Sequence, residues 1–279
     1  MNLTEGWLVI SKMAGLNRNN LEKYYTNPDV CKRCIQAFES VVKPTHTDTI
    51  LEPSAGNGSF SLLLANSFPN LVAFDIQPEH PTITKQDFLT YDLSLLREPI
   101  HVIGNPPFGR QSGIAKKFIQ KACKYASSIA FILPKSFKKA SFQRVFPTSF
   151  HLVFSEDLSE NSFLLDGQPH HVPCVFQIWL RLEDERSVDE IQSPLYYSFV
   201  KKSEAHDFSI RRVGGTAGKL DTHTEDKSIQ SHYFLKLHVD LPDFSETYNQ
   251  LVKFSHDNTV GPKSISKQEL ITELNRLYF

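Results

Sequence analysis

The chain has 279 residues, a formal net charge of −1 and 40% hydrophobic residues, so it can form one large and one small domain. Its near-zero charge gives no overall sign of a polyanion partner. No apolar run approaches the roughly 20 residues that span a bilayer, and residues 7–10 lack the flanks of a secretory signal. The four cysteines indicate no disulfide framework, and Cys31-x-x-Cys34 has no second pair at zinc spacing. We expect an intracellular protein, in cytoplasm or nucleus, with no metal.

The first predicted element is an amphipathic helix over residues 28–42. Pro28 suits a first helical turn, with Thr26 or Asn27 as the cap. Apolar residues then recur at helical spacing, namely Val30, Cys34, Ala37, Phe38 and Val41. The tyrosines Tyr24 and Tyr25, just ahead of the cap, are the part of this segment that can contact a ligand.

A strand–turn–helix unit follows. Residues 49–51 predict a strand that ends at Glu52-Pro53-Ser54-Ala55-Gly56-Asn57-Gly58, and residues 62–68 predict a helix. Glycines in such a turn let the backbone approach a ligand closely. A dinucleotide site would require a third glycine where Ser61 stands. The carboxylate of Glu52 suits a cationic ligand better than a pyrophosphate.

Two further predicted strands carry acids. Residues 71–76 end at Asp75-Ile76, and an acid at this position can accept both hydroxyls of a ribose. Residues 82–88 predict a third short strand, in which Asp87 can accept from an adenine amino group while Phe88 packs on the ring.

The segment Asn105-Pro106-Pro107-Phe108 follows an apolar strand over residues 100–104. Two prolines cannot continue a central strand, so the chain must turn there. The turn leaves an amide, a proline carbonyl and an aromatic ring at the carboxyl end of a strand, where open α/β sheets bind ligands.

The next segment is basic. Between Pro99 and Ser155 there is no acidic residue, and this one-sided charge favours a polyanion track. The lysines on the predicted helix 115–124 can equally serve only to solvate its outer face. The residues that we predict to bind nucleic acid are Arg110, Lys135, Lys138 and Lys139.

The remaining pattern predicts strands at 128–134, 151–154 and 172–182, a helix at 138–146 and a hairpin at Asp166-Gly167. The charged residues 183–190 indicate a boundary between a catalytic domain, 1–185, and an accessory or substrate-recognition region, 186–279. In that region, residues 208–213 and 233–237 predict strands and 267–277 a helix. The glycine turn 214–219 lacks the residues of a complete phosphate loop, and the pair 170–171 has no companions for a metal site.

Together these motifs resemble the class I S-adenosylmethionine-dependent methyltransferases that modify amino groups, over roughly residues 22–182. The resemblance rests on five motifs in order: Tyr24–Pro28, Leu51–Gly58, Asp75, Asp87 and Asn105–Phe108. It implies an α/β, Rossmann-like fold with a seven-stranded, mostly parallel sheet. The strand near 172–182 would be antiparallel, and a small α+β region would follow it.

The resemblance also implies roles for individual residues. The cofactor S-adenosylmethionine would contact Tyr25, Thr26, Glu52, Pro53, Ser54, Gly56, Asp75, Ile76, Asp87, Phe88 and Asn105, and chemistry would fall to Asn105, Pro106, Pro107 and Phe108. The Asn105 side-chain oxygen and the Pro106 carbonyl can each accept one N–H of an adenine amino group. Both then face the positive charge that develops during methyl transfer, while Phe108 stacks on the base.

We therefore expect an adenine-N6 methyltransferase of nucleic acid. A protein glutamine acceptor is an alternative, although such enzymes more usually carry tyrosine where Phe108 stands. A non-catalytic scaffold with this fold is a second alternative. The sequence leaves open DNA or RNA, strandedness and the need for a partner protein.

Overall fold

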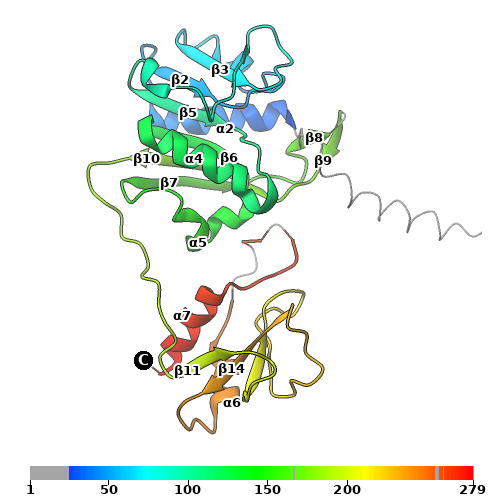
Figure 1. Cartoon of the computed structure of the whole chain (residues 1–279). Helices are drawn as coiled ribbons and strands as arrows, with labels where there is room; N and C mark the ends of the chain where they lie inside the picture. The colour runs from blue at the N-terminus through cyan, green and yellow to red at the C-terminus, as the bar shows by residue number, and fades with distance from the viewer. Residues whose placement is uncertain (1–24, 166, 255–257, 260, 279) are drawn as a thin grey trace, which may run out of the picture. The chain divides into compact units, whose positions relative to one another are not determined.

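The computed structural model describes residues 25–165, 167–254, 258–259 and 261–278. Two compact units make up the chain, and Figure 1 traces both. The first contains residues up to 132, 152–172 and 176–181, and the second contains 133–151, 173–175 and 182–279. The boundary at 185/186 remains a prediction. No helix in the described ranges is long and apolar enough to cross a membrane.

The main sheet has seven strands in the order β4-β3-β2-β5-β6-β10-β7. In chain order they are β2 (Thr49–Glu52), β3 (Leu71–Asp75), β4 (Thr84–Lys85), β5 (Ile100–Gly104), β6 (Ser128–Pro134), β7 (Phe150–Asp157) and β10 (Cys174–Arg181). Strands β2, β3, β4, β5 and β6 pair in parallel. This Rossmann-like arrangement of a mostly parallel sheet confirms the predicted fold class.

Strand β10 is the antiparallel member. The amide of Arg181, at its end, bonds to the carbonyl of Ser127 just before β6 begins. At its other end, Pro173 accepts from the amide of Lys135 just after β6 ends. The amide of Leu182 likewise bonds to Ser149, just before β7 begins. The two neighbours of β10 therefore run opposite to it, as predicted for the strand near 172–182.

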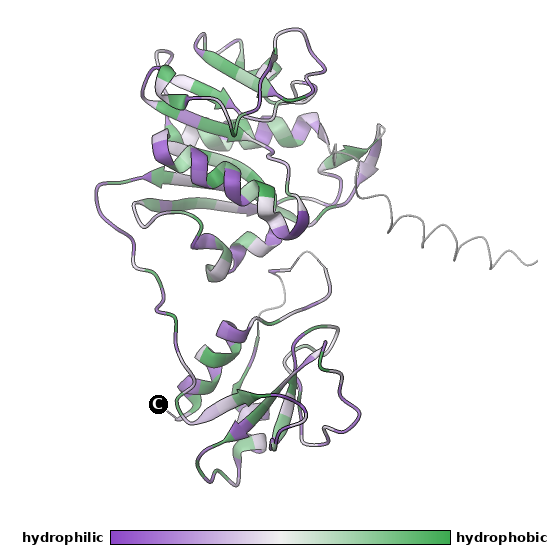
Figure 2. Ribbon diagram, viewed as in Figure 1, coloured by the Kyte–Doolittle hydropathy of each residue, from purple (hydrophilic) through white to green (hydrophobic). Residues whose placement is uncertain are grey.

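Helices cover both faces of this sheet (Figure 1). The longer ones are α2 (Pro28–Val42) and α4 (Gly113–Tyr125), and shorter ones are α3 (Ser61–Leu64), α5 (Ala140–Gln143), η1 (Leu93–Leu95), η2 (Arg110–Ser112) and η3 (Lys135–Lys138). Every residue of β5 and β6 is buried, because helices on both faces leave no solvent side. Figure 2 shows these strands as apolar and the outer side of α4 as polar.

A small three-stranded sheet lies beside the main one in the first unit. It consists of β1 (Tyr25–Thr26), β8 (Phe163–Leu165) and β9 (Gln168–His170), all antiparallel. Strands β8 and β9 form the hairpin predicted around Asp166-Gly167, although Asp166 itself lies outside the described residues. The pairing of β1 with β8 places the segment before α2 next to residues about 140 positions later.

The second unit contains an antiparallel sheet in the order β11-β14-β12-β13. Its strands are β11 (Tyr197–Val200), β12 (Phe208–Arg211), β13 (Leu220–Asp221) and β14 (His232–Leu237), and its helices are α6 (Phe244–Leu251) and α7 (Lys267–Tyr278). Aromatic and aliphatic side chains from the sheet and from both helices form one core. This is the α+β region that the sequence predicts.

Three predicted elements are shorter than expected. The predicted strand 82–88 reduces to β4, whose two residues pair with Phe74 and Asp75 of β3. The helix predicted from residues 62–68 reduces to α3. The helix predicted over 138–146 reduces to α5, because Lys139 has extended backbone angles, φ −79° and ψ 136°, which interrupt helical continuity.

The cap of α2 provides a test of the local sequence reading. The Asn27 side chain accepts from the amide of Asp29 at 3.0 Å, and Pro28 occupies the first turn. We expect Asn27→Ala to lower the free energy of unfolding by about 1 kcal/mol, measured by urea denaturation. Asn27→Asp, which keeps the acceptor, should lose less. Equal stability of wild type and Asn27→Ala would contradict the capping role.

Candidate active site

The carboxyl ends of β2, β3 and β5 open on one cavity of about 340 Å³, within the size range of small-molecule sites. Every residue predicted to bind the cofactor or to perform chemistry lines this cavity: Tyr25, Thr26, Glu52, Pro53, Ser54, Gly56, Asp75, Ile76, Asp87, Phe88, Asn105, Pro106, Pro107 and Phe108. Their roles remain predictions. Tyr24, which belongs to the same motif, lies outside the described residues.

The turn after β2 is tied to the end of β3. The amide of Gly56 donates to Oδ2 of Asp75 at 2.8 Å, and the amide of Gln77 donates to Oδ1 at 2.7 Å. Gly56 has a φ of +53°, in the left-handed region that favours glycine. Each carboxylate oxygen has a second lone pair. Asp75 can therefore hold this turn and still accept from a ligand.

Glu52 lines the same cavity from a buried position. Only 2% of the residue is exposed, and its Oε2 accepts from the amide of Ser61 at 2.8 Å. Burial raises the pKa of the Glu52 carboxyl to about 8, the hydrogen bond to Ser61 opposes this rise, and the nearby charge of Asp75 adds to it. Near neutral pH this carboxyl is therefore largely protonated. A cation that enters the cavity would favour its ionised form.

The Asn105–Phe108 loop is anchored from two sides. The Ser54 hydroxyl donates to the Asn105 carbonyl at 3.2 Å, and the Asn105 side-chain nitrogen donates to Oγ1 of Thr26 at 3.4 Å. Gly104 precedes the loop with a φ of +150°, and a Cβ there would lie 3.3 Å from Cγ of Glu52. A side chain at 104 would therefore press on Glu52, and glycine suits the position.

Behind the loop the backbone is strained. Gly109, Gln111 and Ser112 all have positive φ, of 66°, 53° and 58°. For Gln111 and Ser112, which are not glycine, this conformation costs conformational energy. A Cβ on Gly109 would lie 2.6 Å from Cγ1 of Ile114. This tight reversal connects the loop directly to α4. It keeps Pro107 and Phe108 half-buried at the cavity instead of extending the chain away from it.

The apolar part of the cavity lies near the ends of β3 and β4. Ile76 is 46% exposed, which makes it a surface for a flat ring. Phe88 is only 1% exposed and packs on Phe118 of α4, with ring centroids 4.9 Å apart. Asp87, next to Phe88, accepts from the amide of Leu89 at 2.8 Å. Ile76 therefore offers a larger exposed area than Phe88, the residue that we predict to pack on the ring.

The sequence reasoning missed several lining residues, among them Glu79, Ile114, Phe163 and Val172. Glu79 accepts from the Tyr25 hydroxyl at 2.5 Å, and its amide donates to the Gly56 carbonyl at 2.9 Å. Together they close one side of the cavity over the glycine turn. An acid in the loop after β3 carries no spacing signal, and Phe163 reaches the cavity only because β8 pairs with β1.

The four predicted nucleic-acid-binding residues do not line the cavity. Arg110 is exposed and follows the Asn105–Phe108 loop in the same unit. Lys135 and Lys138 begin and end η3, in the second unit. Lys139 is buried there, and its Nζ contacts Oε2 of Glu269 at 3.2 Å and the Ser264 carbonyl at 3.0 Å. Its ammonium thus has protein partners.

The raised pKa of Glu52 predicts how stability depends on pH. The folded chain holds this proton up to pH 8 or so, while the unfolded chain releases it near 4.5. The free energy of unfolding should therefore fall as pH rises through this interval. Glu52→Gln cannot ionise. Its free energy of unfolding, measured by urea denaturation and taken relative to that of wild type, should therefore rise as pH increases between those limits. A pH-independent difference would contradict the raised pKa.

Comparisons with known proteins are remote. No family model and no curated protein matches the chain. Among solved structures, a candidate RNA methyltransferase from Pyrococcus horikoshii is 16% identical, with a TM-score of 0.44 over 64% of this chain and 100% of that one. The 23S rRNA methyltransferase ErmE is 17% identical, with a TM-score of 0.44 over 58% and 71%. The magnesium protoporphyrin IX methyltransferase ChlM from Synechocystis PCC 6803, solved with bound SAM, is 12% identical, with a TM-score of 0.42 over 56% and 79%. At such identities and scores, these likenesses assign no activity to this chain.

Proposed function

We propose that this protein is an S-adenosylmethionine-dependent N-methyltransferase that methylates the N6 amino group of adenine in nucleic acid, inside the cell. The main observation in support of this proposal is that two sequence motifs line the same cavity. The Asn105–Phe108 loop and the turn tied to Asp75 line the same 340 Å³ space at the carboxyl edge of the sheet. Neither motif alone would specify this chemistry.

The residues present fit S-adenosylmethionine. Asp75 can accept ribose hydroxyls through the lone pairs that Gly56 and Gln77 do not use. Ile76 offers an apolar surface to an adenine ring, and Asp87 is an acceptor beside it. Glu52 supplies a carboxyl that a cationic ligand can ionise. When bound, this cofactor supplies an electrophilic methyl group on a positively charged sulfur.

Asn105 and Pro106 supply the chemistry on the protein side. The Asn105 side-chain nitrogen contacts Oγ1 of Thr26, and the side-chain oxygen is the atom of this amide that can accept a hydrogen bond. That oxygen and the Pro106 carbonyl can each accept one N–H of an amino group whose lone pair is delocalised into a ring. The two bonds draw the nitrogen toward tetrahedral geometry. Both acceptors also stabilise the positive charge that develops on it.

Phe108 would hold the acceptor base, and Arg110 would contact a neighbouring phosphate. Phe108 lines the cavity and is half-buried, so one part of its ring can stack on a base. A target adenine in a duplex would have to leave the base stack to reach this position. Arg110 is exposed two residues beyond Phe108 and suits a phosphate. Lys139 is left out of the proposed contact surface, because its ammonium is paired with Glu269.

Asn105→Ala tests the chemical role. Loss of one acceptor should lower the methyl-transfer rate by roughly 10²–10³-fold, by analogy with the removal of one oxyanion-hole donor, while cofactor affinity changes much less. The rate would be measured with methyl-labelled cofactor and adenine-containing oligonucleotides. The matched control is Asn70→Ala, which removes a half-buried asparagine just before β3, where its side-chain amide contacts the Thr47 carbonyl. Equal rates for both variants would remove Asn105 from the mechanism.

Asp75→Asn tests the cofactor site. An amide in place of this carboxylate loses one acceptor, so the dissociation constant for S-adenosylmethionine, measured by calorimetry, should rise at least tenfold. Because Asp75 also holds the glycine turn, thermal unfolding must first establish that the variant folds. Unchanged affinity in the folded variant would contradict the proposed ribose contact. Absence of cofactor binding by the wild type would instead favour a non-catalytic scaffold.

The acceptor class follows from one labelling experiment. Protein and methyl-labelled cofactor would be incubated with separate pools of duplex DNA, single-stranded DNA, total RNA and protein extract. Label in N6-methyladenine supports the proposal, and the pool that carries it identifies the substrate. Label confined to protein would move the function to an amide acceptor such as glutamine.

A further inference from the structure

The second unit contains a glycine hairpin, residues 212–219, that connects β12 to β13 and has no part in the proposed chemistry. Its backbone is well fixed. The amide of Gly214 donates to the Lys263 carbonyl at 2.8 Å, and that of Gly218 donates to the Arg211 carbonyl at 2.7 Å. The Tyr248 hydroxyl also donates to the carbonyl of Gly218, at 2.6 Å. The hairpin therefore has a defined conformation, which hydrogen bonds to α6 and to the segment before α7 stabilise.

At two of the three glycine positions in this hairpin, the fold itself requires glycine. Gly214 has a φ of +108°, and Gly218 has a φ of +95° with Cδ2 of Phe254 only 2.6 Å from an added Cβ. Side chains at these positions would be strained or would clash. The glycines at 214 and 218 are therefore explained by the fold and give no evidence of a ligand.

At position 215 the fold does not require glycine. A Cβ there would meet nothing within 4 Å, its φ lies outside the left-handed region, and the residue is exposed. The amide of Ala217 bonds to the Gly214 carbonyl at 3.0 Å, which makes Gly215 the second residue of a tight turn. Most residues are compatible with that place in a common turn, and proline is favoured. A glycine that the fold does not require leaves its backbone open to close approach by another molecule.

Positive charge surrounds this exposed backbone. Arg212 and Lys219 begin and end the hairpin, and the bridge between Val213 and Ser264 brings Lys263 alongside it. All three cations are exposed. Lys219 contacts Asp221 at 3.1 Å, yet its side chain remains 60% exposed. Neither residues 208–220 nor 258–268 contain an acidic residue. We name this surface, Arg212, Gly215, Lys219 and Lys263, the basic hairpin surface.

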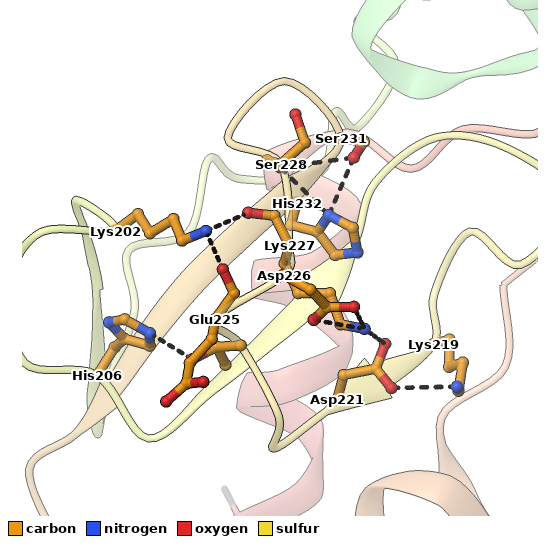
Figure 3. Close-up of polar contacts among 11 residues, drawn as sticks. Lys202, His206, Lys219, Asp221, Glu225, Asp226, Lys227, Ser228, Ser231 and His232 are labelled. Carbon is orange, nitrogen blue, oxygen red and sulfur yellow. Dashed lines mark hydrogen bonds and ion pairs between the residues drawn. The ribbon is translucent and has the colours of Figure 1, made fainter.

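The neighbouring loop, residues 222–231, provides a contrast (Figure 3). Lys227 Nζ contacts Asp226 at 3.2 Å and Asp221 at 3.8 Å. Lys202 Nζ donates to the carbonyls of Glu225 and Lys227, at 2.6 and 2.8 Å. Lys227, together with Lys202 from outside the loop, therefore holds this loop in place. Arg212 contacts the same loop, because its Nε donates to the Gln230 carbonyl at 3.0 Å, and its guanidinium lies over the Tyr233 ring. The Arg212 side chain is nevertheless exposed, so its charge stays accessible to a partner together with those of Lys219 and Lys263.

We propose that the basic hairpin surface is a second nucleic-acid contact, which binds phosphates of the substrate backbone. The inference rests on the proposed function. Exposed cations beside an open backbone amide suit phosphate oxygens, which provide most of the affinity of proteins for nucleic acid. Because the surface is exposed and offers no enclosing pocket residue, each contact is weak, and a polymer that makes several contacts suits it better than a single nucleotide.

The test measures binding of the full chain to labelled single-stranded DNA and RNA oligonucleotides by fluorescence anisotropy at 0.1 M NaCl. One variant, Arg212→Gln with Lys263→Gln, removes two charges. Gly215→Asp places a carboxylate in open space, where it causes no steric conflict. The control is Lys236→Gln, an exposed lysine of β14 that pairs opposite Ser198. It lies four residues, about 13 Å along the strand, from His232, which pairs with Arg211.

The double variant should bind about fivefold more weakly for each lost phosphate contact, and its salt dependence should be shallower by about 1.4 in log–log slope. Gly215→Asp should also weaken binding, and Lys236→Gln should bind like wild type, all with unchanged thermal unfolding. If wild type binds and all variants bind equally, the inference is wrong while the proposed function stands. If wild type binds S-adenosylmethionine but no nucleic acid, the proposed substrate class itself fails. Saturable binding of inorganic triphosphate that displaces the oligonucleotide would overturn the inference in favour of a nucleotide site.

Discussion

The hydrogen bond from the Gly56 amide to the Asp75 carboxylate, 2.8 Å long, is the contact on which the rest of the site depends. It joins the ends of two adjacent parallel strands, β2 and β3, at the edge where the cavity opens. Because parallel strands end on the same side, a polar residue at the end of each one faces the same space. The Asn105 loop, at the end of β5 on the other side of β2, completes this edge. One sheet edge thus brings together three chain segments, at Gly56, Asp75 and Asn105.

Two carboxyl groups in this cavity have opposite environments. Glu52 is buried within the sheet, and desolvation raises its pKa to about 8. Asp75 lies at the strand end and accepts two backbone amides. A cationic ligand that enters this cavity would favour release of the proton from Glu52. Gly104 permits this arrangement, since a side chain there would press on Glu52.

In the second unit, polar interactions serve two different purposes. In the 222–231 loop, lysines, acids and carbonyls satisfy one another, and this network fixes the loop over the sheet (Figure 3). In the glycine hairpin, backbone bonds fix the conformation, and Lys263 contributes its carbonyl to them and not its ammonium. The Arg212 side chain contacts the Gln230 carbonyl and the Tyr233 ring but remains exposed. Chain positions whose charge is not required for folding are the ones that can contact a partner. The same reasoning separates Lys139, which is buried against Glu269, from the exposed Arg110.

The sequence by itself determined the elements whose causes are local. The capped helix α2, the apolar strands β2, β3, β5 and β6, and the turns at Gly56 and Asn105 follow from caps, periodicity, glycine and proline. The rule that ligands bind at the carboxyl ends of parallel strands then predicted that these residues share one cavity.

Only the tertiary structure decided which other residues line this cavity. Glu79 and Phe163 reach the cavity through the contact with Tyr25 and the pairing of β1 with β8. Lys139, which was predicted to bind nucleic acid, is buried with its ammonium against Glu269, and α5 begins only after this residue because the chain is extended there. Such outcomes depend on contacts between residues distant in the sequence, such as Tyr25 with Glu79 and Lys139 with Glu269, which local patterns do not encode.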